Sequence, residues 1–463
     1  MRLTRLRAVL TASLIVFTAA AQEDNYSRQR ELLDRFITVG LRDEKAYEML
    51  SELTHRAPHR LSGSAGADTA VEVTKRLMVD IGCDSVWTEP CMVPHWIRGP
   101  VEVVSVLPSK DRRRRMPLSA CALGGSVGTP RQGIVAEVLE VKSLQEARAL
   151  GEKAKGRIIF YNRPMDRSKL STFEAYGAAV DQRSAGASEA AKVGAVAVLV
   201  RSMTLATDDV PHTGSLNYLA DAPRIPAAAL STRAANALGN LLKRDPHARV
   251  RIVLSCETLA SVPSANVIGE IGGKERPDEI VLVGGHLDCW DKGAGAHDDG
   301  SGCVHAIEVL NLFRQLQIVP RRTIRAVMFM NEENGSQGGK AYGDASARQR
   351  EKTIAAIESD RGGFVPRGFT VQTDSATFQR VLRWRPLFER IAAGRFVKGS
   401  SGVDVASVVD KGAAGFGLDV ADDRYFDVHH SDNDTINSVN ARELELGAIA
   451  TAFLCYLISD EGL

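Results

Sequence analysis

The second half of the chain alternates strand-length apolar runs with helix-length segments. Residues 326–330 are Ala-Val-Met-Phe-Met, with no polar interruption, and such runs are typical of strands buried on both faces of a sheet. Strands are predicted at 266–271, 279–284, 323–330 and 354–359, and helices at 302–316, 337–349 and 441–458. This order predicts an α/β sheet with helices on both faces.

The chain is too long, at 463 residues, for one ordinary compact core, so two domains are expected. The sequence pattern changes over residues 118–258, where predicted strands are short and apolar and predicted helices are rich in small residues. Their predicted strands are 134–139, 157–160, 193–200 and 250–254, and their helices are 185–192 and 232–243. We expect 118–258 to be an inserted α/β domain. The main domain is then discontinuous, over 22–107 and 264–463, and its first part holds predicted helices within 23–60 and 67–82 and a strand at 101–107.

The first 21 residues have the pattern of a signal peptide. Three arginines within the first seven residues precede an apolar run over 8–18, which is too short to span a bilayer. Three alanines then offer a cleavage site near Ala21-Gln22. We therefore expect the protein to be exported, to the periplasm or as a secreted protein, with no membrane attachment of the mature form. An N-terminal membrane anchor is the alternative.

The balance of charge argues against nucleic acid as the main partner. The chain has 58 Lys+Arg and 57 Asp+Glu, and loss of three arginines with the signal peptide leaves 55 basic residues and a net charge of −2. Nucleic-acid binding calls for a basic excess. The seven cysteines include no C-x-x-C pair, so a cysteine–zinc site is not expected. Cys289 and Cys303 are expected to be small buried residues.

Five polar motifs stand out after residue 280. They are His286-Leu287-Asp288, Asp298-Asp299, Glu332-Glu333, Glu358-Ser359-Asp360 and His429-His430-Ser431. Three of them follow predicted strands, and open α/β sheets bind ligands at the carboxyl ends of their strands. A lone motif of this kind is usually a turn or a solvated helix start. The ordered set predicts that the five motifs converge on one site.

Imidazole and carboxylate donors of this kind predict a hydrolytic site with two zinc ions per chain. Two ions held ~3.5–4 Å apart need a shared ligand, and Asp298 is expected to bridge them. The first ion is expected on His286, Asp298 and Asp360, and the second on Asp298, Glu333 and His430.

Glu332 is expected to stay off the metal. It is expected to act as the general base, taking a proton as the metal-bound hydroxide forms and returning it to the leaving amine. Asp288, two residues after His286, is expected to orient the imidazole. His429 is expected to line the pocket or support it, and His297 to be structural rather than a ligand.

The ordered motifs resemble those of the co-catalytic zinc exopeptidases, which include bacterial aminopeptidases and glutamate carboxypeptidases. Longer strings are similar to the carboxypeptidase Q (plasma glutamate carboxypeptidase) branch. These strings are Arg60-Leu61-Ser62-Gly63-Ser64, Glu189-Ala190-Ala191-Lys192-Val193-Gly194-Ala195, Pro211-His212-Thr213-Gly214, Gly285-His286-Leu287-Asp288-Cys289-Trp290-Asp291 and His429-His430-Ser431. The resemblance covers nearly all of the chain after residue 21, and the insert looks like a protease-associated domain.

The resemblance implies a zinc metallo-exopeptidase that hydrolyses dipeptides or short peptides, is exported and forms a homodimer, as relatives often do. In the family's H-[ST]-x-x-D-T motif the ligand is the histidine directly before Ser or Thr, which is His430 here. Asn334 and the variant loop 335–339 depart from the family pattern. Because neither is a ligand, these departures leave the substrate preference open rather than the catalysis.

The leading hypothesis is a two-zinc dipeptidase or carboxypeptidase. An aminopeptidase with the same metals differs only in the terminus it recognises, and the sequence does not separate the two. A glutaminyl cyclase-type acyltransferase shares the fold but uses one zinc, and the retention of both His286 and Asp360 argues against it. A non-enzymatic, receptor-like relative would lose ligands, whereas this chain keeps every one.

Overall fold

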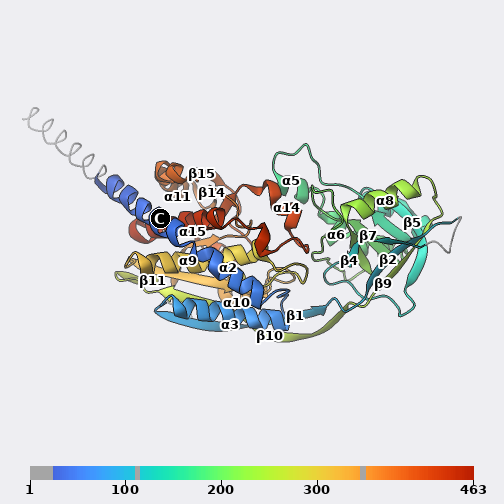
Figure 1. Ribbon diagram of the computed structural model, residues 1–463, viewed down its shortest axis with the longest axis horizontal. Coiled ribbons are helices and arrows are strands. Elements are labelled where there is room, and N and C mark those ends of the chain that lie inside the picture. Colours follow the sequence, from blue (N-terminus) through green and yellow to red (C-terminus); the bar gives the residue numbers. More distant parts are fainter. Residues whose placement is uncertain (1–23, 110–114, 345–350) are drawn as a thin grey trace, which may run out of the picture.

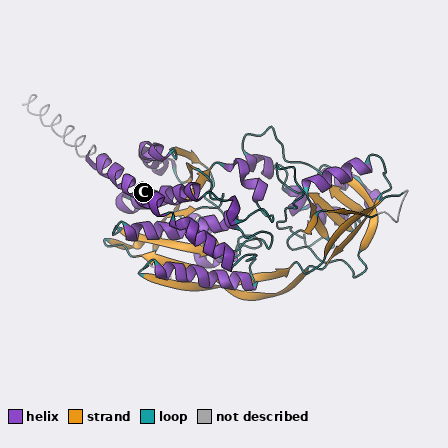
Figure 2. Ribbon diagram, in the orientation of Figure 1, coloured by secondary structure: helices purple, strands orange, loops and turns teal. Residues whose placement is uncertain are grey.

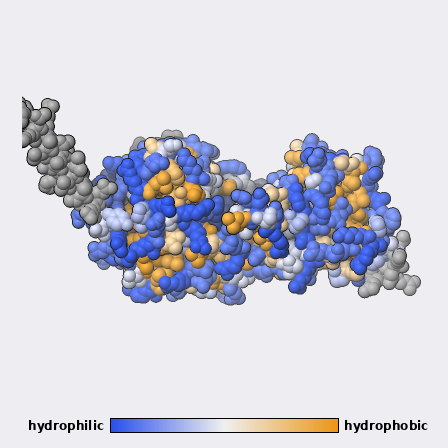
Figure 3. All heavy atoms as spheres, turned by 90° about the horizontal axis from the view of Figure 1, so that it is seen from above, coloured by the Kyte–Doolittle hydropathy of each residue, from blue (hydrophilic) through white to orange (hydrophobic). Residues whose placement is uncertain are grey.

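The computed structural model describes residues 24–109, 115–344 and 351–463. Two bodies lie side by side, each built on an eight-stranded mixed sheet (Figure 1). The expected mixed α/β fold with packed helices is confirmed. The predicted signal peptide lies outside the described residues. Seen from above, the surface is mostly hydrophilic, with apolar residues in small patches over both bodies (Figure 3).

The first body holds a sheet of order β1-β10-β12-β11-β13-β16-β14-β15. Its four central strands are parallel to one another: β12 (Arg322–Phe329), β11 (Arg276–His286), β13 (Lys352–Glu358) and β16 (Ala414–Val420). Val281 and Val283 pack into one hydrophobic core, and Ile280 and Leu282 into another. Because both faces of β11 are covered, its sequence is apolar without alternation. The sheet ends in β14 (Pro366–Gln372) and β15 (Arg395–Lys398).

Helices cover both faces of this sheet. One core contains residues of the long helices, which are α2 (Lys45–Arg56), α3 (Ala65–Asp80), α9 (Ser301–Gln315) and α15 (Ala441–Glu461). The opposite core contains residues of α10 (Gln337–Asp344) and α13 (Ala406–Val409). Local signals fix where the helices begin: the Ser64 hydroxyl accepts from the amide of Ala67 at the start of α3, and Asn440 accepts from that of Glu443 at the start of α15. Shorter helices are α11 (Ser375–Val381), α12 (Arg385–Phe388) and α14 (Tyr425–Val428).

The second body is built on a sheet of order β3-β2-β9-β5-β6-β7-β8-β4. Its strands are β2 (Glu102–Leu107), β3 (Met116–Leu118), β4 (Ala120–Ala122), β5 (Ile134–Val141), β6 (Ile158–Tyr161), β7 (Ala197–Arg201), β8 (Ala227–Leu230) and β9 (Arg249–Leu254). Its helices are α4 (Leu144–Ala149), α5 (Thr172–Gly177), α6 (Asp181–Ser184), α7 (Gly186–Lys192) and α8 (Thr232–Leu242). Strand 101–107 was expected in the main domain. It is observed as β2, which pairs with β9 of the insert and therefore belongs to this second sheet.

A long two-stranded ribbon joins the bodies (Figure 2). Its strands, β1 (Ser85–Ile97) and β10 (Glu257–Ile271), pair in antiparallel fashion along their length. Arg98, at the end of β1, anchors the junction: its guanidinium lies 2.5 and 2.7 Å from the two carboxylate oxygens of Asp291 and 2.9 Å from Glu102. Trp290 packs edge-on against Trp96. Among the described helices, none is long and apolar enough to cross a membrane.

Candidate active site

The predicted motifs meet at the carboxyl edge of the parallel strands in the first sheet. His286 is the last residue of β11, and Glu332 and Glu333 follow β12. Asp360 follows β13, the neighbour of β11 on its other side. Asp298 lies in the loop between β11 and α9. Because the four strands point the same way, their polar ends gather in one place, as the strand-end argument predicts.

Asp298 presents its two oxygens to two different groups. Its Oδ1 lies 3.2 Å from His286 Nε2, and Asp360 Oδ1 lies 3.4 Å from that same nitrogen. Its Oδ2 lies 3.2 Å from His430 Nε2, which is also 3.1 Å from Glu333 Oε2. The five residues therefore form two donor groups that share Asp298, and this is the arrangement expected of a bridging carboxylate.

The environment of His286 decides which nitrogen is free. Its Nδ1 lies 2.9 Å from the backbone carbonyl of Asp288, and since a carbonyl only accepts, Nδ1 carries the hydrogen. Nε2 is then the nitrogen that faces Asp298 and Asp360 and would bind a metal ion. The sequence expected the Asp288 side chain to orient this ring, but its carboxylate is 3.9 Å away. It accepts instead from the amides of Asn331 and Glu332, so the side chain fixes the Glu332-Glu333 turn and the backbone carbonyl fixes the ring.

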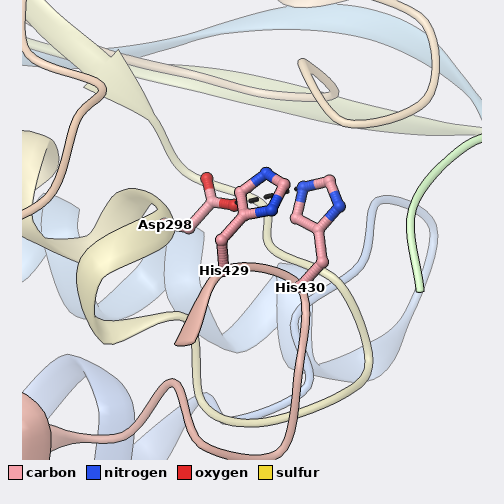
Figure 4. Close-up of side chains that lie close together, drawn as sticks. All are labelled: Asp298, His429 and His430. Carbon is pink, nitrogen blue, oxygen red and sulfur yellow. Dashed lines mark ion pairs between the residues drawn. The ribbon is translucent and has the colours of Figure 1, made fainter. Parts of the chain in front are cut away.

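His429 and His430 are stacked, with ring centroids 3.5 Å apart. Figure 4 shows both rings beside Asp298, reaching it from the chain that follows α14. His429 Nε2 is 3.6 Å from Asp298 Oδ2, so His429 is also within reach of a cation there. His430 alone of the two contacts Glu333. The geometry therefore favours His430 as the donor of this group, with His429 lining the cavity.

Two buried charged residues hold the loop that carries Asp298. Asp434 accepts from the amide of Asp298 at 3.1 Å. Arg60 is fully buried and donates to three carbonyls of the loop, those of Leu287, Ala294 and Gly295. Arg60 belongs to a string that resembles the family, and Asp434 is the aspartate of the H-[ST]-x-x-D-T motif, but no role was predicted for either. Only the folded loop shows that they shape the site.

The donor set fits divalent cations. Asp298 Oδ2 and Asp360 Oδ1 are buried and accept no hydrogen bond, which is costly for a carboxylate unless a cation balances it. Burial lowers the pKa of His286, but the neighbouring carboxylates of Asp360 and Asp298 outweigh burial and raise it well above its ordinary value. Burial, reinforced by the charge of Asp360, raises the pKa of Glu332 well above its usual range. Metal ions can take the place of the protons held by such a cluster.

His297 is structural, as expected from the sequence. Its ring stacks on Phe364 with centroids 4.2 Å apart, accepts from the amide of Gly363 at Nδ1, and lies 3.2 Å from the carbonyl of Ser438 at Nε2. The seven cysteines are free, and Cys289 and Cys303 are buried. These observations leave the metal-binding role to the histidine and carboxylate groups around Asp298.

A cavity of about 540 Å³ opens beside these groups, within the range of small-molecule sites. Both bodies line it. The first body contributes Glu332, Asp360 and His429, and the second contributes Phe173, Tyr176 and Arg183. Phe173, Tyr176 and Arg183 were not predicted from the sequence, because they lie outside any motif. Phe173 and Tyr176 are on α5, where they pack against Phe426 of α14. Together the sheet, the donor groups and the cavity define a metal-dependent hydrolase.

Comparison with known proteins also indicates a metal-dependent hydrolase. Residues 266–453 match the model of Peptidase family M28. Carboxypeptidase Q of Bos taurus is 33% identical over 423 residues, which cover 91% of this chain and 86% of the relative. Carboxypeptidase Q of Homo sapiens is 31% identical with the same shares covered, 91% and 86%. The chain therefore belongs to peptidase family M28, and it is a metallo-exopeptidase of the carboxypeptidase Q type.

Solved structures with a similar fold include a peptidase of this family and an aminopeptidase. The Peptidase M28 precursor from Shewanella amazonensis SB2B is 30% identical, with a TM-score of 0.89, and the match covers 94% of this chain and 97% of that one. A zinc aminopeptidase from Bacillus subtilis is 20% identical, with a TM-score of 0.61 over 88% of this chain and 93% of the other. At that identity the second match speaks for the fold alone.

Proposed function

We propose that this chain is an exported two-zinc peptidase that hydrolyses dipeptides or short peptides and recognises their free C-terminus. The observation that carries the proposal is the pair of donor groups that share Asp298 beside a cavity lined by both bodies. A zinc aminopeptidase of the same fold is among the similar structures, which supports zinc as the metal.

Each ion would be held by three residues. His286, Asp298 and Asp360 would hold the first, and Asp298, Glu333 and His430 the second. When bound, zinc acts as a Lewis acid toward the scissile carbonyl and the attacking water.

Glu332 supplies the proton transfer in this proposal. It lines the cavity next to Glu333, and its backbone is held by the Asp288 carboxylate, which accepts from its amide at 3.0 Å. Its side-chain carboxylate would take a proton from the attacking water and deliver it to the leaving amine. Positive charge nearby favours the ionised form of a carboxyl group. Bound zinc ions would therefore lower the pKa of Glu332 and keep it ionised, as a general base must be.

The choice of terminus rests on the charged residues that line the cavity. Arg183 is the only lysine or arginine among the described residues that line it. The lining carboxylates are Asp298, Glu332, Glu333 and Asp360, and all four are assigned to the metals or to proton transfer. The N-terminal ammonium group of a substrate would therefore have no unassigned carboxylate to bind, whereas its C-terminal carboxylate could bind the guanidinium of Arg183.

Arg183 has donors to spare. Its Nη2 donates to the Tyr176 hydroxyl at 2.7 Å, and its Nε is buried without a hydrogen-bond partner. Its Nη1 lies 3.4 Å from Nδ1 of His430. If His430 binds metal through Nε2, its Nδ1 carries a hydrogen, and arginine can only donate. Two donors then face each other, and a substrate carboxylate is an acceptor that could serve both.

The wider setting belongs to the same proposal. The signal-peptide pattern of residues 1–21 supports export and cleavage near Ala21-Gln22. The mature enzyme would act on short peptides and would form a homodimer, as the resemblance implies. The insert would comprise 118–258 together with strands β2 and β3, which pair in its sheet.

A dipeptide panel tests the proposal. Free, N-acetylated and C-amidated forms of one dipeptide are compared with zinc-loaded and with chelated protein, and bound zinc is counted. We expect two ions per chain, loss of activity on chelation, and slow cleavage of the amide form alone. An aminopeptidase would instead reject the acetylated form. One zinc ion per chain in fully active protein would favour the glutaminyl cyclase-type chemistry.

A further inference from the structure

The string Pro211-His212-Thr213-Gly214 has no part in the function described above. It lies in the second body, between β7 and β8, and is far in sequence from every predicted ligand. In the folded chain it lies against the two histidines of the candidate metal site, more than 200 residues further along the chain.

Two hydrogen bonds join this string to the backbone of the histidine pair. The amide of Thr213 donates to the carbonyl of His430 at 2.9 Å. The Nδ1 of His212 lies 2.7 Å from the carbonyl of His429, and because a carbonyl only accepts, the imidazole is the donor. Gly214 permits the close approach: a Cβ there would lie 2.6 Å from His430 Nδ1.

The other side of the string is fixed to the insert. The amide of His212 donates to the Ser202 hydroxyl at 2.8 Å, and that hydroxyl donates to the carbonyl of Leu230 at the end of β8. The Thr213 hydroxyl donates to the carbonyl of Ala122 in β4 at 2.9 Å. The string is therefore a rigid bridge from the insert sheet to the histidine pair.

His430 needs such support. Its backbone has φ of 59°, in the left-handed region that side-chain-bearing residues adopt at a cost and keep only when their surroundings impose it. Both flanking carbonyls, those of His429 and His430, are bonded to the insert. The contacts from the second body therefore help to set the direction in which the His430 ring points, toward Asp298 and Glu333.

We propose that His212 is a positioning residue for the metal ligand His430, so that the insert completes the half of the metal centre formed by Asp298, Glu333 and His430. The inference rests on the metal site under Proposed function and extends it, because it gives the insert a role in metal binding besides its share of the cavity. Residues that hold a ligand from outside the metal shell typically change metal affinity by about 10- to 100-fold.

A pair of substitutions tests this inference on the full-length protein. His212→Leu fills the buried space without a donor, and His212→Asn keeps an N–H near the position of Nδ1. Zinc content and the rate of zinc loss to a chelator are measured. We expect His212→Leu to hold one of its two ions about 10- to 100-fold more weakly and the other with unchanged affinity, and His212→Asn to restore most of the loss.

Tyr161→Phe is the matched control. It removes a buried hydrogen bond of the insert, from the Tyr161 hydroxyl to the carbonyl of Gly186, which involves neither histidine of the pair, and should leave zinc binding unchanged. If His212→Leu does not fold, Ser202→Ala, which removes the hydroxyl that braces His212, should give a smaller loss of the same ion.

The outcomes separate the two proposals. Native protein that binds fewer than two zinc ions refutes the two-zinc assignment and this inference together. Native protein with two ions and His212→Leu with unchanged zinc loss refutes the positioning role alone. Equal losses in His212→Leu and His212→Asn would also overturn it, since the hydrogen bond would then be irrelevant.

Discussion

Replacing Arg183 with glutamine tests whether the enzyme recognises a substrate carboxylate. The guanidinium lines the cavity and donates to neutral groups, the Tyr176 hydroxyl and the Thr213 carbonyl, so its charge is available to a ligand. A hydrogen bond to a charged group is worth about 1.5–3 kcal/mol, and about 1.4 kcal/mol is a tenfold change. Arg183→Gln should therefore lower kcat/KM for a free dipeptide by about 10- to 150-fold.

The assay crosses this variant with the substrate. Native enzyme and Arg183→Gln are each given a dipeptide and its C-terminal amide, and the four kcat/KM values form a double-mutant cycle. The amide should be cut at about the same rate by both enzymes, because it lacks the group that Arg183 binds. Zinc content should stay at the native level, which separates a substrate effect from damage to His430.

Arg201→Gln provides the matched control. Arg201 is a partly buried arginine of the same body that donates to the neutral side chains of Asn162 and Asn236, outside the catalytic cavity. Arg201→Gln should change kcat/KM for neither substrate by more than about twofold, because the residue lies outside the cavity and contacts no group of the site. If Arg183→Gln slows the free dipeptide and its amide equally, the carboxylate-binding role of Arg183 is wrong.

Two further predictions concern carboxyl groups. Glu332→Gln should lower kcat by about 10²- to 10⁴-fold while both zinc ions remain bound, which steady-state kinetics and metal analysis check together; an unchanged kcat would remove Glu332 from the proton transfer. Burial raises the pKa of Glu445, whose Oε1 has no hydrogen-bond partner, from 4.5 to about 7. The folded state therefore favours its protonated form, and the stability that this gives is lost as the pH rises from about 4.5 to about 7. In denaturant titrations, Glu445→Gln should have the same free energy of unfolding as the native protein near pH 4.5 but a higher one at pH 8, by up to about 3 kcal/mol. Equal free energies at pH 8 would show that burial does not raise the pKa of Glu445.

The central strands were predictable because burial on both faces leaves an unmistakable apolar run. The expected strand 323–330 is β12, observed at Arg322–Phe329. The ribbon was not predictable: β1 was missed, and β10 begins nine residues before the expected strand, because much of that extension is exposed and lacks a buried face. Strand 193–200 begins later, at Ala197, because Gly194 turns the chain with φ of 82° after α7.

The sequence predicted that the motifs meet, because three of them follow predicted strands and the ends of parallel strands share one edge of the sheet; the choice of His430 over His429 came from the family resemblance. His286, Asp298, Glu333, Asp360 and His430 lie together as the motif order predicts. Chain direction and residue type can both be read from the sequence, so this convergence could be predicted before any contact was known.

Only the tertiary structure decided what surrounds the donors. The contact of Arg183 with His430 spans 247 residues, and that of His212 with His429 spans 217. Both depend on how the second body docks against the first, and no spacing within a motif encodes that docking. The same holds for the Asp288 side chain, which accepts from the amides of Asn331 and Glu332, because the pairing of β11 with β12 brings the residues after β12 beside it.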